Sequence, residues 1–247
     1  MTALRRLTVM EAKLFMRDPA AVVMALAFPV LLIIVLGGVM PGFRTAVAEF
    51  AGLRPIDIYL PVVAALAVAT VAINSLPTTV AGYRERGVLR RMATTPVRPA
   101  KLLGAQLLVS VAATALAVGL AVVAAVVAFR VPLPEHPVSF LGVLLLGSAA
   151  TFAVGLLIAA LAPTGRAANA IGMLVYFPML FFAGVWTPGP MMPETIRRIS
   201  DLTPLGALSQ TMQASWAGDV VRPLHLLVMA GYLAVIGTLA ARLFRWR

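Results

Sequence analysis

The sequence contains no cysteine and only two histidines, which limits its chemistry from the outset. Without cysteine there are no disulfides and no thiolate metal sites. His136 and His225 lie in or near predicted connections and have no neighbouring metal ligands. The His-Glu-x-x-His and Gly-x-Ser-x-Gly motifs and the phosphate-binding Gly-x-x-x-x-Gly-Lys-Ser/Thr loop are also missing. These absences predict that the chain is not an enzyme and holds no metal or cofactor of its own.

Charge is scarce as well. Charged residues make up 12% of the chain and hydrophobic residues 61%, against about 25% and about 45–50% in a soluble domain. Six stretches without Asp, Glu, Lys or Arg are long enough to cross a hydrocarbon core of about 30 Å. These stretches are residues 19–43, 58–83, 102–129, 137–165, 167–193 and 223–241. We therefore predict an all-α integral membrane protein, in which residues 1–247 form one domain with six transmembrane helices.

The absence of charge inside these stretches bears on how transport would be powered. Transporters coupled to protons or ions normally hold an ionisable residue at membrane depth. A proton-coupled mechanism is therefore disfavoured, although a sodium site made of Asn or backbone oxygens stays open. If the chain moves a substrate uphill, we expect the energy to come from outside the chain.

The positions of the basic residues predict the orientation. The net charge is +11, but the charges lie between apolar runs, which argues for a membrane rather than nucleic acid. With six spans, 14 Lys and Arg residues lie on the side of both termini and 6 on the other. Because basic residues favour the cytoplasmic side, we predict a plasma-membrane protein with both termini in the cytoplasm.

Residues 1–18 precede the first span. Leu7, Met10 and Leu14 recur at helical spacing, and the basic residues lie largely off this stripe. The pattern predicts an interfacial helix on membrane lipids, ending at Asp18-Pro19. The alternative is an ordinary basic flank that sets topology. The first apolar run is too long for a signal peptide, so we expect it to remain as the first span.

A basic segment separates the second and third apolar runs. Six of the twenty Lys and Arg residues lie between Arg84 and Lys101. Arg84 to Met92 can form about two turns of helix, with Val88, Leu89 and Met92 on one face, and Thr95-Pro96 disfavours its continuation. We predict that residues 84–96 form a cationic, partly apolar coupling segment that docks on a cytoplasmic partner. The alternative is a topology-setting loop that binds anionic lipid.

Residues 188–222 connect the fifth and sixth runs. Pro193 and Glu194 favour the start of one short helix, and Leu205 to Trp216 favour a second. The second is too polar for a full span, because it holds several Ser and Gln residues. A re-entrant segment and a solvent-exposed loop both fit this composition.

Polar and aromatic residues at membrane depth are candidates for a substrate path. They are Thr70, Asn74 and Ser75 on the second span, and Tyr176, Phe177, Phe181 and Phe182 on the fifth. Buried polar groups in lipid seek partners, so a packing role is favoured for Asn74 and for the aromatic residues. An uncharged, aromatic path suits a lipophilic or amphipathic substrate.

The basic segment carries a resemblance to a known family. Glu85-Arg-Gly-Val-Leu-Arg-Arg-Met-Ala-Thr-Thr-Pro resembles the Glu-Arg-Gly-Thr-Leu…Thr-Pro loop of type-2 ABC exporter permeases. The resemblance extends to the N-terminal helix, the six spans and the proline-rich stretch from Phe182 to Thr203-Pro, and is strongest to daunorubicin-resistance-like membrane subunits. Val88 stands where the family usually has Thr, and Arg90 where an acid is common.

This resemblance implies a partner and a mechanism. Two copies of the chain would pair with two ABC ATP-binding subunits, which hold the ATP and Mg²⁺, and would export a drug, natural product or lipid, as in multidrug or antibiotic resistance. Contacts with the ATP-binding subunits would come from the interfacial helix and from the coupling segment. The coupling residues are Arg84, Glu85, Arg86, Gly87, Val88, Leu89, Met92, Thr95 and Pro96. The alternatives are a secondary transporter and a non-transporting membrane anchor that recruits a cytoplasmic partner.

Overall fold

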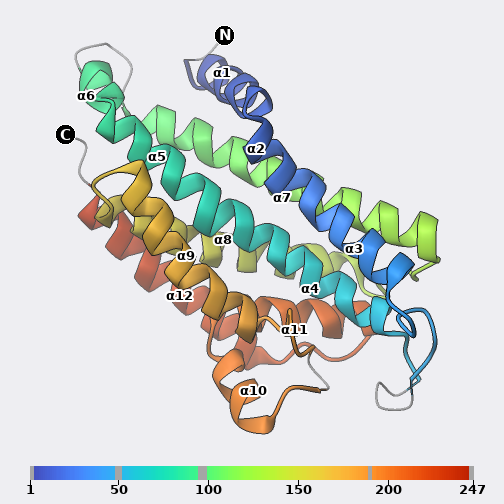
Figure 1. Ribbon diagram of the computed structural model, residues 1–247. Coiled ribbons are helices and arrows are strands. Elements are labelled where there is room, and N and C mark those ends of the chain that lie inside the picture. The colour runs from blue at the N-terminus through green and yellow to red at the C-terminus, as the bar shows by residue number, and fades with distance from the viewer. Residues whose placement is uncertain (1–2, 48–51, 94–98, 189–190, 245–247) are drawn as a thin grey trace.

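The computed structural model describes residues 3–47, 52–93, 99–188 and 191–244. Within these ranges the regular secondary structure is entirely helical (Figure 1). Six helical segments are long and apolar enough to cross a membrane. The prediction of an all-α protein with six membrane-spanning helices is therefore confirmed.

The first two spans are each interrupted by a π-helix. The first consists of α2 (Pro19–Val22), η1 (Val23–Ala27) and α3 (Phe28–Val39), and the second of α4 (Pro55–Ala69), η3 (Thr70–Ser75) and α5 (Leu76–Glu85). The other four are α7 (Pro99–Phe129), α8 (Pro137–Leu161), α9 (Gly165–Phe182) and α12 (Pro223–Leu243). The shorter helices are α1 (Ala3–Arg17), α6 (Val88–Ala93), α10 (Glu194–Asp201) and α11 (Pro204–Ala217).

Proline starts five of the six spans, because its fixed φ suits the first helical turn and its missing N–H would have no partner there. These prolines are Pro19, Pro55, Pro99, Pro137 and Pro223. Side chains cap two of the spans. The Asp18 carboxylate accepts a hydrogen bond of 3.1 Å from the backbone N–H of Ala21, and the Thr164 hydroxyl accepts one of 3.1 Å from Ala167.

The second span is the centre of the bundle. In its most apolar window 89% of the residues are buried, against 67% for α8 and a third or less for the other four spans. Figure 1 shows α4 and α5 running between α3 and α7 on one side and α8, α9 and α12 on the other. Both termini lie at one end of the bundle with α1 and α6, here called the α6 end (Figure 1). The opposite end carries α10 and is called the α10 end.

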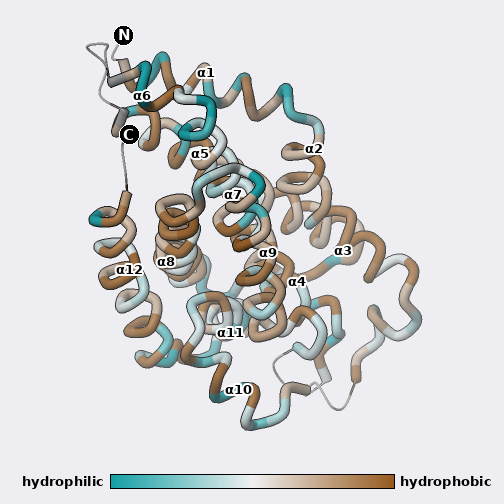
Figure 2. The backbone as a smooth tube through the Cα atoms, turned by 60° about the vertical axis from the view of Figure 1, so that its left-hand side comes forward, coloured by the Kyte–Doolittle hydropathy of each residue, from teal (hydrophilic) through white to brown (hydrophobic). Residues whose placement is uncertain are grey.

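Hydropathy follows this arrangement. Figure 2 shows apolar residues along the spans, and hydrophilic residues gathered at α1, α6 and the turns. Most residues of α7, α9 and α12 are only partly buried although these helices are apolar. Such faces suit contact with lipid or with another membrane helix.

The two π-helices pack against each other. Each ends two residues before a proline, Pro29 after η1 and Pro77 after η3. Because proline has no N–H, it removes a backbone hydrogen bond and loosens the helix just before it. Glycines of neighbouring helices face the turn that the π-helix widens, and their lack of a side chain leaves room for it. A Cβ at Gly155 of α8 would overlap the Ala72 carbonyl oxygen, and one at Gly172 of α9 would lie 2.8 Å from the Ile73 oxygen. Glycine at these two positions lets α8 and α9 approach the backbone of η3.

An arginine fastens the second span to α7 at the α10 end. The Arg54 guanidinium bonds both carboxylate oxygens of Asp57, at 2.9 and 2.7 Å. It also donates to the carbonyl oxygens of Phe129 (3.0 Å) and Arg130 (3.2 Å), where α7 ends. A cation suits this place, because the last carbonyls of a helix lack partners.

The two short helices predicted between the fifth and sixth spans are present as α10 and α11. α10 is largely exposed, whereas most of α11 is buried against α4, α8 and α12. The exposed-loop interpretation is therefore wrong for residues 204–217. The reason is a set of contacts that composition does not reveal, such as the Trp216 indole, which donates to the Pro132 carbonyl (3.0 Å) and meets the Phe140 ring edge to face. That α11 enters the bilayer stays a prediction.

A buried polar cluster joins α10, α11 and α12. His225 at the start of α12 is buried, and its Nε2 lies 3.0 Å from an Asp201 carboxylate oxygen. Its Nδ1 lies 3.1 Å from the Thr211 hydroxyl, which itself donates to the Ala207 carbonyl. These bonds hold the short helices against the sixth span.

Candidate functional site

The coupling segment begins differently from the sequence prediction. A single helix was expected from Arg84 to Met92, but α5 continues through Glu85 and a separate helix, α6, starts at Val88. The break falls at Gly87, whose φ of 67° is a left-handed conformation that interrupts a helix. α6 is therefore set off from the second span by a fixed turn. Thr95 and Pro96 lie outside the described residues.

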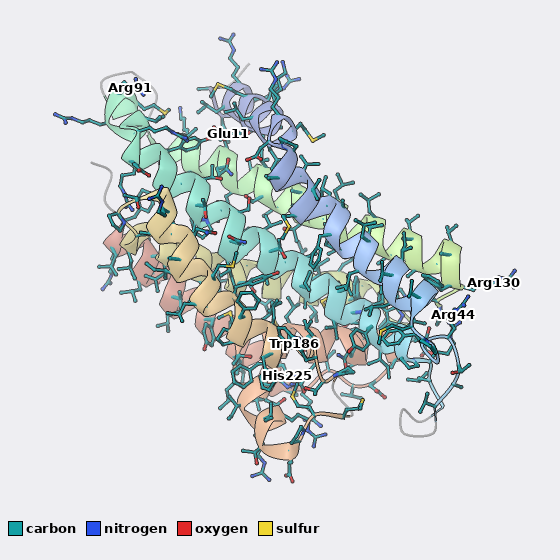
Figure 3. The ribbon with its side chains drawn as sticks, in the orientation of Figure 1. Glu11, Arg44, Arg91, Arg130, Trp186 and His225 are labelled. Atoms are coloured by element: carbon teal, nitrogen blue, oxygen red, sulfur yellow. The ribbon has the colours of Figure 1, made fainter. Side chains whose placement is uncertain are left out.

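The apolar face of α6 points into the chain. Leu89 is only 1% exposed, and Val88 and Met92 are half-buried against the same core. The expectation that Leu89 is presented to a partner is therefore wrong for this conformation, because the face shared by these residues packs on the protein's own helices α5 and α7. The side chains of Arg90 and Arg91 on α6 are exposed, as are those of Glu85 and Arg86 before it. Figure 3 shows Arg91 projecting from the α6 end.

Arg84 and Glu85 fasten the end of α5 to the turn between α8 and α9. The Arg84 guanidinium donates to the carbonyl oxygens of Ala159 (2.9 Å), Ala160 (3.3 Å) and Ala162 at the end of α8. The Glu85 carboxylate accepts a 2.9 Å hydrogen bond from the backbone N–H of Gly165, the first residue of α9. Each charge matches the helix end that it meets. The second span and the α8–α9 turn are thus joined at the base of α6.

The helix α1, predicted to lie in the membrane interface, packs on α7, and most of its predicted apolar stripe stays on the outer surface of the chain. Leu7 contacts the core, but Met10 and Leu14 are exposed, and Glu11 is the buried residue, at 2% exposure. The Tyr83 hydroxyl donates a 2.6 Å hydrogen bond to the Glu11 carboxylate, and the Arg86 guanidinium lies 5.6 Å from the centre of the Tyr83 ring. Such a placement is typical of a cation–π contact. α1 is therefore linked to the end of the second span.

Burial changes the acidity of Glu11. It raises the pKa of the Glu11 carboxyl above its usual 4.5, and the hydrogen bond from Tyr83 offsets part of the rise. The carboxylate form is the costlier one in this environment, because burial removes the water that stabilises its charge.

Two adjoining cavities of about 410 and 250 Å³ form what we call the polar groove. One wall of the groove is formed by α1 and α2. The other wall is formed by α5, which belongs to the second span, and by α9. Five residues line both cavities: Asp18, Ala21, Ser75, Thr78 and Thr79. The first cavity lies at the α6 end and includes Glu11, Glu85 and Arg86, and the second reaches Thr70, Asn74 and Asn169 at η3. The groove therefore leads from the coupling segment to the π-helix of the second span.

The structure brings together part of the predicted substrate path. Thr70, Asn74 and Ser75 all line the polar groove. Thr70 also donates to the Leu66 carbonyl, and its hydroxyl lies 2.8 Å from that of Tyr176, so this pair serves helix packing. The other predicted aromatic residues stay apart from the groove.

Those aromatics make ring contacts with other aromatic residues. Phe177 and Phe181 are exposed. The Phe177 ring meets that of Tyr176 edge to face at 5.7 Å, whereas Phe181 meets Phe182 edge to face at 5.6 Å and its ring centre lies 6.5 Å from that of Trp186. Trp186 lies toward the α10 end (Figure 3). The fifth span thus contributes Asn169, rather than its aromatic residues, to the groove.

Sequence reasoning missed several groove residues. Asn169 is seven residues from Tyr176, two helical turns along the same face, and this spacing was the available signal. No comparable signal marked Asp18, Thr78 and Thr79, which lie at the ends of apolar runs. The threonine hydroxyls donate to the backbone carbonyls of Asn74 (2.7 Å) and Ser75 (3.0 Å), four residues earlier in the same span. Among the described ranges no group of three or more His, Asp or Glu residues is placed to hold a metal ion.

Comparison with known proteins gives one finding. No curated protein matches the sequence. The protein-family model described as ABC-2 type transporter matches residues 2–215, which include α1, the first five spans, the coupling segment and most of α11. Since the match covers most of the chain and agrees with its six membrane-spanning helices, the protein belongs to the ABC-2 type transporter family and is a multi-pass permease subunit of an ABC transporter.

Proposed function

We propose that this permease works as an exporter, moving a lipophilic or amphipathic substrate outward with energy from a separate ATP-binding subunit. In this proposal the α6 end faces the cytoplasm, as the distribution of Lys and Arg predicts. Two copies of the chain assemble with two ATP-binding subunits, and ATP and Mg²⁺ bind to those partners alone.

The observation that carries the proposal is the joint at the base of α6. Arg84 and Glu85 bind the two helix ends of the α8–α9 turn, so a displacement of α6 is passed to the second, fourth and fifth spans together. A topology-setting loop needs no such joint. A docking element that transmits movement does.

The polar groove is placed to receive this movement. It begins at Glu85 and Arg86 and ends at η3, where the second span is widened before Pro77. π-helices occur frequently at functional sites, because the widened turn is a weak point in the helix. We propose that α5 pivots at η3 when α6 moves, and that this changes the width of the groove.

The chemistry of the groove favours an amphipathic substrate. The cavity at the α6 end is lined by the charged groups of Glu11, Glu85 and Arg86. The cavity beside η3 shares Asp18 with it and otherwise has neutral polar side chains together with Ala25 and Met24. A molecule with a polar group and an apolar body can satisfy both parts. A drug, a natural product or a lipid has this character.

The test begins with the exposed arginines of α6. Reversing their charge in an Arg90→Glu/Arg91→Glu variant leaves Leu89 and the core in place, and it should weaken capture of the ATP-binding subunit by at least about tenfold. Capture is measured by co-purification in mild detergent, and transport by ATP-dependent substrate uptake into inverted vesicles. Both should fall together.

A matched control reverses two arginines of α10, Arg197 and Arg198, which lie at the opposite end. It should leave both measurements unchanged. If the α6 variant captures the ATP-binding subunit as well as the natural chain does, the docking proposal is wrong. If transport continues without ATP and stops with an uncoupler, the chain is a secondary transporter.

A further inference from the structure

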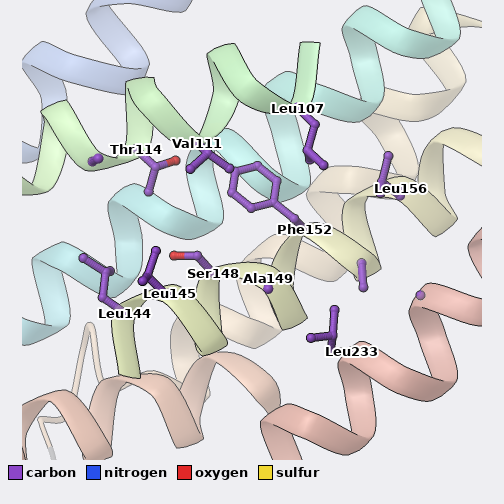
Figure 4. Close-up of a pocket in the computed structure, with 13 residues that line it drawn as sticks. Leu107, Val111, Thr114, Leu144, Leu145, Ser148, Ala149, Phe152, Leu156 and Leu233 are labelled. Carbon is purple, nitrogen blue, oxygen red and sulfur yellow. The ribbon is translucent and has the colours of Figure 1, made fainter. Parts of the chain in front are cut away.

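A cavity distinct from the two that form the polar groove lies on the other side of the second span. It has a volume of about 350 Å³ and is bounded by α7, α8 and α12 (Figure 4). Much of its wall is made by Val111, Leu145, Phe152 and Leu233, and none of the described residues that line it is charged. None of its lining residues belongs to the polar groove. It is therefore a separate site, in the size range of small-molecule pockets.

Two hydroxyls interrupt this apolar wall. Thr114 is the middle residue of α7, and Ser148 is one residue from the middle of α8. Figure 4 shows both side chains between the two helices, on facing walls of the cavity. Because α7 and α8 both span the membrane, these hydroxyls lie near the middle of the hydrocarbon core.

The Thr114 hydroxyl has no hydrogen-bond partner among the described residues, although Thr114 is only 3% exposed. Other buried threonines in the spans behave differently. Thr70 and Thr151 each donate to the carbonyl four residues earlier, at 2.8 and 2.7 Å. A buried polar group without a partner is costly, and more so at a depth that water does not reach. The Thr114 hydroxyl is therefore a buried donor in this cavity that a ligand can satisfy.

The depth of Thr114 restricts what can satisfy it. The headgroups and ester oxygens of phospholipids lie at the edges of a hydrocarbon core about 30 Å thick, so they are about 15 Å away. Acyl tails reach the middle of the bilayer but carry no acceptor. The partner must bring an acceptor oxygen to this depth inside an apolar body.

We propose that the cavity between α7, α8 and α12 binds a neutral lipophilic molecule with an isolated ketone, ester or ether oxygen, which accepts a hydrogen bond from Thr114. The molecule reaches the site from the bilayer, because α7 and α12 expose most of their apolar surface. The site does not depend on the direction of transport or on the ATP-binding partner.

Benzophenone is a suitable probe, because it is a neutral ketone that crosslinks to nearby C–H bonds under light. The full chain is placed in nanodiscs of one phosphatidylcholine, irradiated with increasing benzophenone and mapped by mass spectrometry. Crosslinks should concentrate on the lining residues of α7, α8 and α12. In a Thr114→Val variant the half-saturating concentration should rise about fivefold, the effect of one lost hydrogen bond.

Three comparisons make the test specific. Thr238→Val changes an exposed threonine of α12 that bonds its own helix, and it should leave labelling unchanged. Ala149→Phe fills the cavity and should abolish labelling at the lining residues. Diphenylmethane, which lacks the carbonyl, should compete about fivefold less well than an unreactive diaryl ketone against the natural chain, and equally well against Thr114→Val.

Three results would overturn the proposal. One is crosslinking spread evenly over all lipid-facing helices. Another is a half-saturating concentration that Thr114→Val leaves unchanged. The third is a phosphatidylcholine molecule that stays bound to the natural chain and that benzophenone does not displace, since an acyl tail would then be the occupant.

Discussion

The contact between α8 and η3 gives a sharp prediction for Gly155→Ala. The added methyl group would overlap the carbonyl oxygen of Ala72 and lie 2.9 Å from its carbon. A carbon and an oxygen in contact lie about 3.3–3.6 Å apart, so relieving the overlap with the oxygen requires the two helices to separate by roughly 1.5 Å. The obstacle is backbone, and no rotamer change can remove it.

The size of the effect follows from this geometry. Overpacking a tight core typically costs 1–3 kcal/mol, and a clash with backbone belongs near the upper end of that range. For a chain of this size about 3 kcal/mol corresponds to a fall in melting temperature of roughly 6–12 °C. The same separation would disturb Asn74 and Ser75, which follow Ala72 on η3, so substrate transport should also fall.

Gly142→Ala is the matched control, because Gly142 lies on the same helix and has no atom within 4 Å of an added Cβ. Alanine in place of an unconstrained helical glycine should stabilise the protein by about 0.5–1 kcal/mol. Thermal melting of both purified variants in the same detergent measures the difference. If Gly155→Ala melts at the temperature of Gly142→Ala, α8 does not approach η3 as closely as described.

Two further predictions concern buried polar groups. Burial raises the pKa of the Glu11 carboxyl, so its contribution to stability is complete below its usual pKa of 4.5 and is lost as pH rises through the higher folded value. Glu11→Gln should remove this pH dependence. If the melting temperatures of both proteins change with pH in the same way between about pH 4 and pH 8, the prediction is wrong. His225→Ala removes a partner of both Asp201 and Thr211 and should destabilise the protein by about 2–3 kcal/mol and speed proteolysis at α10. Replacing the exposed His136 is the control, and equal proteolysis of the two variants would show that the buried polar cluster does not hold α10 in place.

The helices of this protein could be located from the sequence because each depends on local properties. A run of about 20 uncharged apolar residues is long enough to cross a bilayer, and in lipid it has to satisfy its backbone hydrogen bonds within itself. Proline and Asp18 mark the helix starts. The first short helix was predicted from Pro193 and Glu194 and the second over residues 205–216, and both are present.

The direction in which a helix faces was harder to predict. The stripe of Leu7, Met10 and Leu14 correctly indicated a helix, but it did not reveal that Glu11 packs inside. A charged side chain such as that of Glu11 is expected to be exposed unless its hydrogen-bond partner is known. Here the partner is Tyr83, which lies 72 residues away. Leu89 was correctly placed on an apolar face of α6, but that face covers the protein's own helices.

The sequence alone therefore determined the class of protein, the six spans and the basic segment between the second and third. These follow from hydropathy, length and charge, which are properties of neighbouring residues. Only the tertiary structure decided that Arg84 and Glu85 join the second span to the α8–α9 turn, that the polar groove ends at η3, and that Thr114 faces an apolar cavity without a partner. Each of these depends on groups far apart in the chain, whose meeting is set by how the helices pack and by the small residues that let them approach.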